Sequence, residues 1–136
     1  MSAISDLDDL VGSWLTVPDV AEMLGVDPGK VRRLVQERRL VAVRRGTPPV
    51  LSVPAAFLVA GHLANPAAPD QPREDRPWAV LAALQGTLTV LGDDGFSDEE
   101  VVAWLFAVED SLGVAPIEAL RAGRKTEVRR VAQAQL

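Results

Sequence analysis

The residues best suited to chemistry in this sequence are cations, and half of them lie in one short segment. Residues 28–45 hold seven of the fourteen Lys and Arg side chains and a single acid, which gives the segment a formal charge of +6. Lysine and arginine pair with phosphates, and arginine can also donate two hydrogen bonds to a guanine edge. The segment therefore favours a polyanion such as DNA as the partner. The alternative is a basic helix face that contacts only solvent.

The sequence offers few residues for a catalytic site, a metal site or a disulfide. The chain has no cysteine and one histidine, His62, which excludes disulfides and thiolate zinc sites and leaves a Ser-His-Asp triad without support. Five acids lie between residues 93 and 100, but their spacing is not that of a calcium-binding EF-hand loop. Asp98 and Glu99 instead suit the first turn of a helix. The sequence predicts no catalytic residue, no metal site and no cofactor, and hence not an enzyme.

The average composition conceals the basic segment. The chain has 136 residues, 48% of them hydrophobic, and a net charge of −5. Its isoelectric point of about 4.8, taken alone, argues against a nucleic-acid partner. By segment, however, the charge is −6 over residues 1–27 and −7 over residues 77–110. No apolar run approaches the roughly 20 residues of a membrane span and the N-terminus is acidic, so we expect a cytoplasmic protein with no membrane contact.

Two short helices joined by a tight turn are expected to position the cations. Thr16 can cap the first helix, and Asp19 stands where it completes a capping box. Gly25 supplies the turn, and Asp27 followed by Pro28 can cap and start a second helix. This order of elements is the helix-turn-helix pattern.

The second helix is predicted to run from Pro28 to about Arg39 and to have two distinct faces. Val31, Leu34 and Val35 form one apolar stripe at helical spacing. The side chains that can donate hydrogen bonds lie opposite or beside that stripe, namely Lys30, Arg32, Arg33 and Gln36. The helix is therefore predicted to bury one face and to present the other to DNA.

A β-hairpin is predicted after this helix. Residues 41–43 and 50–53 alternate like short strands, and residues 44–49 form a basic turn between them. Arg44 and Arg45 are placed to reach phosphate or the minor groove; the alternative is that they only keep an edge strand soluble. A helix starting at Pro54 is expected next, with Phe57, Leu58 and Leu63 facing inward.

The segment from Leu15 to Leu40, followed by the basic hairpin and residues 53–58, resembles the excisionase/MerR-type winged helix-turn-helix. The resemblance implies that the four donors of the second helix face the major groove and that Arg44 and Arg45 lie on the wing. Arg33 then suits a guanine edge and Gln36 an adenine edge, while backbone N–H groups near Thr16 suit a phosphate. The Thr-Pro-Pro sequence at residues 47–49 departs from the commoner glycine-rich wing tip.

Prolines divide the chain. The thirteen residues 65–77 contain four prolines, which predicts an extended linker over residues 65–76 between two units, 1–64 and 77–136. The second unit is expected to be all-helical, which makes the whole fold mainly α with a short hairpin. Its first helix is predicted over about residues 77–91, and its second begins after the capping box of Ser97. A short third helix, Pro116–Leu120, is closed by Gly123. The last helix is basic and carries Val128, Val131, Ala132 and Leu136.

The second unit resembles the C-terminal domain of a family of small actinobacterial DNA-binding regulatory proteins, through residues 86–106, 110–124 and 127–130. A more distant resemblance, through Trp104 and Pro116 with their neighbours, is to the partner-binding domain of Xre-type antitoxins. The sequence thus predicts a transcriptional regulator that binds double-stranded DNA, as a homodimer on paired half-sites. The alternative is an interaction module whose residues 77–136 bind a protein partner.

Overall fold

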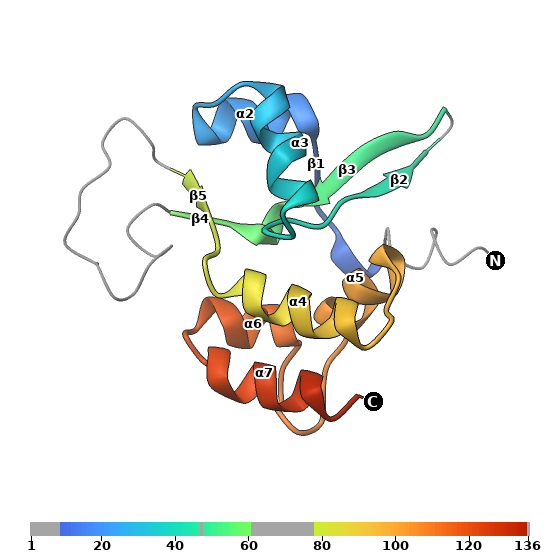
Figure 1. Cartoon of the computed structure of the whole chain (residues 1–136), viewed down its shortest axis with the longest axis vertical. Coiled ribbons are helices and arrows are strands. Elements are labelled where there is room, and N and C mark those ends of the chain that lie inside the picture. Colours follow the sequence, from blue (N-terminus) through green and yellow to red (C-terminus); the bar gives the residue numbers. More distant parts are fainter. Residues whose placement is uncertain (1–8, 47, 61–77, 136) are drawn as a thin grey trace.

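The computed structural model describes residues 9–46, 48–60 and 78–135, and in this part of the chain helices predominate over short antiparallel strands (Figure 1). Helix α2 (Val17–Leu24) begins at the predicted capping box. Thr16 Oγ1 accepts a hydrogen bond of 3.3 Å from the Asp19 backbone N–H, and the Asp19 carboxylate accepts one of 3.2 Å from the Thr16 N–H. Gly25, with φ of 70°, ends the helix in the left-handed conformation.

Helix α3 (Pro28–Gln36) starts as predicted but ends three residues early. Asp27 caps its N-terminus, and Val31 and Leu34 are buried. At its C-terminus the N–H of Arg39 donates to the Leu34 carbonyl, while Arg38 adopts a positive φ of 61°. These contacts form a Schellman motif in which Arg38 stands where glycine is usual. The predicted end at Arg39 was wrong because no glycine in the sequence signals this stop.

The predicted wing is present as part of a three-stranded antiparallel sheet. Strands β1 (Trp14–Thr16) and β2 (Val43–Arg45) flank the central strand β3 (Val50–Pro54), in the order β1-β3-β2. In the hairpin, Val43 lies opposite Ser52 and Arg45 opposite Val50. The first strand was predicted two residues too early, so both arginines belong to β2 rather than to the turn.

Where the chain forms a second small sheet, one predicted helix is wrong and the start of another is wrong. After Pro54 there is one 3-10 turn, η1 (Ala55–Phe57), and then strand β4 (Leu58–Ala60). This strand pairs antiparallel with β5 (Trp78–Val80), at the start of the segment predicted as a helix from about residue 77. Pairing between segments about twenty residues apart satisfies both backbones, and helical spacing alone could not reveal it. Leu63 lies outside the described residues.

Four helices follow β5 in the described residues, as predicted for the C-terminal half, although the first begins at Leu84 instead of about residue 77. They are α4 (Leu84–Asp93), α5 (Asp98–Phe106), α6 (Pro116–Arg121) and α7 (Lys125–Gln133). Ser97 Oγ accepts a hydrogen bond from the Glu100 N–H at 3.2 Å, and the Glu100 carboxylate accepts one from the Ser97 N–H at 2.9 Å. Hydrogen bonding to the Glu100 carboxylate, from the Ser97 backbone N–H first and from the Ser97 side chain second, lowers the pKa of Glu100. Gly123, with φ of 87°, follows α6 as predicted, and Leu136 lies outside the described residues.

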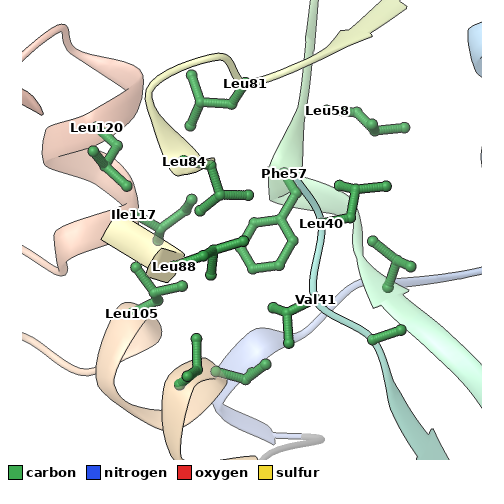
Figure 2. Close-up of a cluster of buried hydrophobic side chains, with 14 of the residues drawn as sticks. Leu40, Val41, Phe57, Leu58, Leu81, Leu84, Leu88, Leu105, Ile117 and Leu120 are labelled. Atoms are coloured by element: carbon green, nitrogen blue, oxygen red, sulfur yellow. The ribbon is translucent and has the colours of Figure 1, made fainter. Parts of the chain in front are cut away.

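One hydrophobic core extends through both halves of the chain. Figure 2 shows the Phe57 ring between Leu40 and Val41 on one side and Leu84 and Leu88 on the other. From the C-terminal helices, Leu105, Ile117 and Leu120 complete this cluster.

A polar contact joins the same two halves. The Arg121 guanidinium of α6 donates hydrogen bonds through Nη1 to the Ala56 carbonyl at 2.7 Å and to the Leu58 carbonyl at 3.0 Å. The C-terminal helices are therefore fixed to η1 and β4 both by apolar packing and by an arginine. The linker predicted over residues 65–76 lies outside the described residues, and the boundaries 1–64 and 77–136 stay predictions.

We expect Phe57→Ala to destabilise the whole molecule at once. Phe57 is fully buried, and loss of a buried aromatic ring lowers the free energy of unfolding by about 3–5 kcal/mol. Urea unfolding followed by far-ultraviolet circular dichroism and by tryptophan fluorescence should give one coincident transition for wild type and variant. Val108→Ala, at a side chain that is 71% exposed, is the matched control and should change little. Two separate transitions in the wild type would contradict a shared core.

Candidate nucleic-acid interface

The exposed face of α3 carries the cations that the sequence singled out. Val31 and Leu34 are buried, and Val35 is half-buried. The four predicted donors are all exposed, namely Lys30, Arg32, Arg33 and Gln36. Within the described residues, no hydrogen bond or ion pair occupies any of these four side chains. Their hydrogen-bonding groups are thus available to an external partner.

The N-terminus of α3 is open as well as cationic. Pro28 fills the first turn, and Gly29 next to it has no side chain to separate an approaching surface from the helix. A Cβ at Gly29 would lie 3.0 Å from the Asp27 carboxylate oxygen. The first-turn N–H groups carry the positive end of the helix dipole, which suits a phosphate. The carboxylate of Asp27 is the one acid at this end of the helix.

Thr16 lies apart from that face. It is half-buried in β1 opposite Ser52, and its hydroxyl already accepts the hydrogen bond from Asp19. Its side chain therefore caps α2, and any contact with a phosphate must come from the backbone N–H groups of the following turn. Asp19 in that turn opposes such a contact by its charge.

The two arginines of the wing differ in their surroundings. Arg44 is exposed, whereas Arg45 is half-buried with its guanidinium 4.9 Å from the centre of the Trp14 ring. This cation-π contact links the far strands β1 and β2 of the sheet. Sequence reasoning missed Trp14, although a tryptophan in an edge strand beside a basic hairpin is a signal that could have found it.

The C-terminal end of α3 meets the C-terminal helices. Arg38 turns towards α4, where a Cβ at Gly92 would lie 2.9 Å from its Nη1. A cavity of about 160 Å³ separates the end of α3 from α4 and α5, with Gln36, Arg38 and Asp98 among its lining residues. Gln36 thus lies at the boundary between the exposed face and the C-terminal helices.

The described residues provide neither a cluster of metal ligands nor a membrane-spanning helix. Among them there is no group of three or more His, Cys, Asp or Glu side chains that could hold a metal ion. No helix in the same part of the chain is long and apolar enough to cross a membrane. His62 lies outside the described residues.

Comparison with known proteins decides the family. A family model described as the winged helix-turn-helix domain of DNA-binding protein Rv2175c matches residues 4–58, and a model described as the Rv2175c C-terminal domain of unknown function matches residues 81–135. The DNA-binding protein Rv2175c of Mycobacterium tuberculosis is 34% identical over 130 residues, which cover 87% of this chain and 77% of that protein. The chain belongs to the Rv2175c family.

A solved structure supports the same relationship. The NMR structure of Rv2175c superposes with a TM-score of 0.68 at 32% identity, over 90% of this chain and 80% of that one. The mainly helical fold and its N-terminal winged helix-turn-helix are thereby confirmed. The Rv2175c family descriptions assign no excisionase or MerR subtype.

Replacing the cap of α3 should weaken the fold without touching the cations. Asp27 Oδ1 accepts a hydrogen bond of 3.0 Å from the Lys30 N–H. We expect Asp27→Ala to lower the free energy of unfolding by about 1 kcal/mol, measured by urea denaturation. Asp27→Asn, which retains a capping oxygen, should stay close to wild type. An equal loss in both variants would mean that the cap does not stabilise α3.

Proposed function

We propose that this protein is a non-enzymatic, sequence-preferring DNA-binding protein and a transcriptional regulator. In this proposal α3 enters the major groove and the β2-β3 wing contacts the adjacent backbone. The observation that carries it is the exposed face of α3, where four hydrogen-bond donors stand without internal partners on a helix whose opposite face is buried. Membership of the Rv2175c family, named for a DNA-binding protein, supports the same function.

The roles of the side chains follow from their chemistry. Arg33 points furthest from the buried stripe and can donate two hydrogen bonds to guanine O6 and N7, and Gln36 can pair with an adenine edge. Lys30 and Arg32 flank them and suit the phosphates on either side of the groove. One helix would thus both recognise base edges and fix the protein on the DNA through phosphate contacts.

The backbone contacts extend beyond α3. Arg44 is exposed on the wing and suits a DNA phosphate. Arg45 would have to reach the DNA backbone while its guanidinium lies beside the Trp14 ring. The N–H groups that follow Thr16 at the start of α2 would contribute another phosphate contact. About four to six such contacts predict a slope of about −4 to −5 for the logarithm of affinity against that of salt concentration.

Several finer features belong to this proposal. The excisionase/MerR-type docking mode guides the placement of α3 and the wing. A cytoplasmic location follows from DNA as the partner. A homodimer on half-sites one helical turn apart would bind DNA more tightly than one winged helix-turn-helix domain alone.

The alternative function, a protein-interaction module in residues 77–136, has weaker support. Among the described residues of that segment, the exposed large apolar side chains are Trp78 and Val108. Two such residues do not amount to the extended apolar patch that marks many protein interfaces. A stoichiometric protein ligand recovered by the full chain, with no DNA bound, would favour this alternative.

Arg33→Ala and Arg44→Ala should weaken DNA binding in different ways. Arg33→Ala should lose about 1–3 kcal/mol on the preferred sequence alone, because it removes a base contact. Arg44→Ala should weaken all sequences about equally and reduce the salt slope by about 1, because it removes a phosphate contact. Fluorescence anisotropy at two salt concentrations, on a duplex obtained by selection from random sequences, measures both effects.

The matched control is Arg130→Ala on α7, which lies at the end of the molecule opposite to α2 and α3 (Figure 1). It should leave affinity and salt slope unchanged within error. Salt-independent binding, or full affinity in both Arg33→Ala and Arg44→Ala, would overturn the proposed function.

A further inference from the structure

The tip of the wing has a chemistry that phosphate binding does not explain. Pro48, Pro49 and Val50 are all exposed, and the Val50 side chain is 46% exposed although it belongs to a strand whose later residues are buried. Val50 is one of four large apolar side chains with such exposure in the described part of the chain. The core does not bury these residues, so they are free to contact a partner.

Proline makes the tip unsuited to phosphate. A wing tip rich in glycine can offer backbone N–H groups to the DNA backbone, whereas Pro48 and Pro49 have none. Between Gly46 and Val50 the described residues of the tip therefore present apolar surface and carbonyl oxygens. The cations of the wing, Arg44 and Arg45, lie behind the tip on β2.

We propose that Pro48, Pro49 and Val50 form an apolar wedge that enters the minor groove beside the site read by α3 and kinks the duplex there. This inference rests on the proposed function. Proteins that bend DNA through the minor groove insert proline or aliphatic side chains between base steps while nearby cations hold the phosphates. The wing has the same arrangement, with the exposed cation Arg44 on strand β2 and apolar residues at the tip.

The hairpin is built to carry such a wedge. Strand β3 is the central strand of its sheet, and its inner residues Ser52, Val53 and Pro54 are buried. Trp14 of β1 and Arg45 of β2 contact each other from the two outer strands, which ties the end of β2 nearest the turn to the rest of the sheet. The tip itself projects away from the helices (Figure 1). Proline also loses almost no side-chain entropy when it is buried.

Among apolar partners, DNA fits this surface better than a protein does. The wedge is small, and it lies on a hairpin that carries cations, with Arg45 directly opposite Val50 and the exposed Arg44 one position further from the tip. The hairpin belongs to the same sheet that packs beside α2. A kink also has a consequence for sequence preference. Pyrimidine-purine steps such as TA unstack more easily than AA steps, so the wing should favour a TA step without hydrogen-bonding to it.

The experiment measures DNA bending by energy transfer between dyes at the two ends of a duplex that carries the selected site. The full chain is compared with Val50→Thr, which keeps the branched shape, and with the double variant Pro48→Ser with Pro49→Ser. Val108→Thr is the matched control, because it makes the same change at an exposed valine of the C-terminal half. Circular dichroism confirms that each variant is folded.

We expect the wild type and Val108→Thr to bend the duplex by roughly 20–90°. They should also bind a site with a TA step under the wing several-fold tighter than the same site with AA. Val50→Thr and the proline variant should bind with the wild-type salt slope but lose most of the bend and the preference for TA.

The outcomes separate this inference from the function on which it rests. Salt-dependent, sequence-preferring binding by a wild type that leaves DNA straight would overturn the wedge and leave the proposed function standing. A change of oligomeric state in Val50→Thr, measured by sedimentation, with bending unaltered would identify the tip as a protein contact and also overturn it. A wild type that fails to bind any DNA would overturn both.

Discussion

The structure depends above all on the burial of Phe57. Its ring packs between residues 40–41, which follow the helix-turn-helix, and Leu84 and Leu88 of α4, and it lies 5.8 Å from the ring of Phe106 in α5. Phe57 is the last residue of the turn η1, strand β4 follows it directly, and β4 pairs with β5. The buried apolar residues of both halves belong to one cluster, and small units gain most from sharing a core. The C-terminal helices are thus a support for the DNA-reading half as well as a separate family signature.

This support leaves the reading face free. The apolar stripe of α3 packs inward, and in the described part of the chain no acid forms an ion pair with Lys30, Arg32 or Arg33 on its exposed face. Acids are numerous in the chain; the described ones next to α3 are Asp27 and Glu37 at its two ends, and others cluster away from it, for example in the first turn of α5. Segregation of charge, rather than net charge, therefore determines where a polyanion can approach, and the acidic surroundings would repel it from other faces.

The junction between α3 and the C-terminal helices is the second consequence of the shared core. Arg38 holds a left-handed backbone conformation with its guanidinium against Gly92, and the adjoining cavity borders both Gln36 and Asp98. The segment that follows the helix proposed to read bases therefore lies against α4 through Arg38, while a cavity separates the end of α3 itself from α4 and α5.

The sequence by itself determined what depends on neighbours a few residues apart. The capping boxes at Thr16 and Ser97, the stop at Gly25 and the two-faced character of α3 are local, because their hydrogen bonds and helical spacing span three or four residues. The cations of α3 were predictable for the same reason. Only the tertiary structure decided that residues 58–60 and 78–80 pair as strands, that the Arg38 guanidinium lies against Gly92, and that Trp14 contacts Arg45. Each of these depends on a partner distant in sequence, whose approach is set by how the common core closes around Phe57.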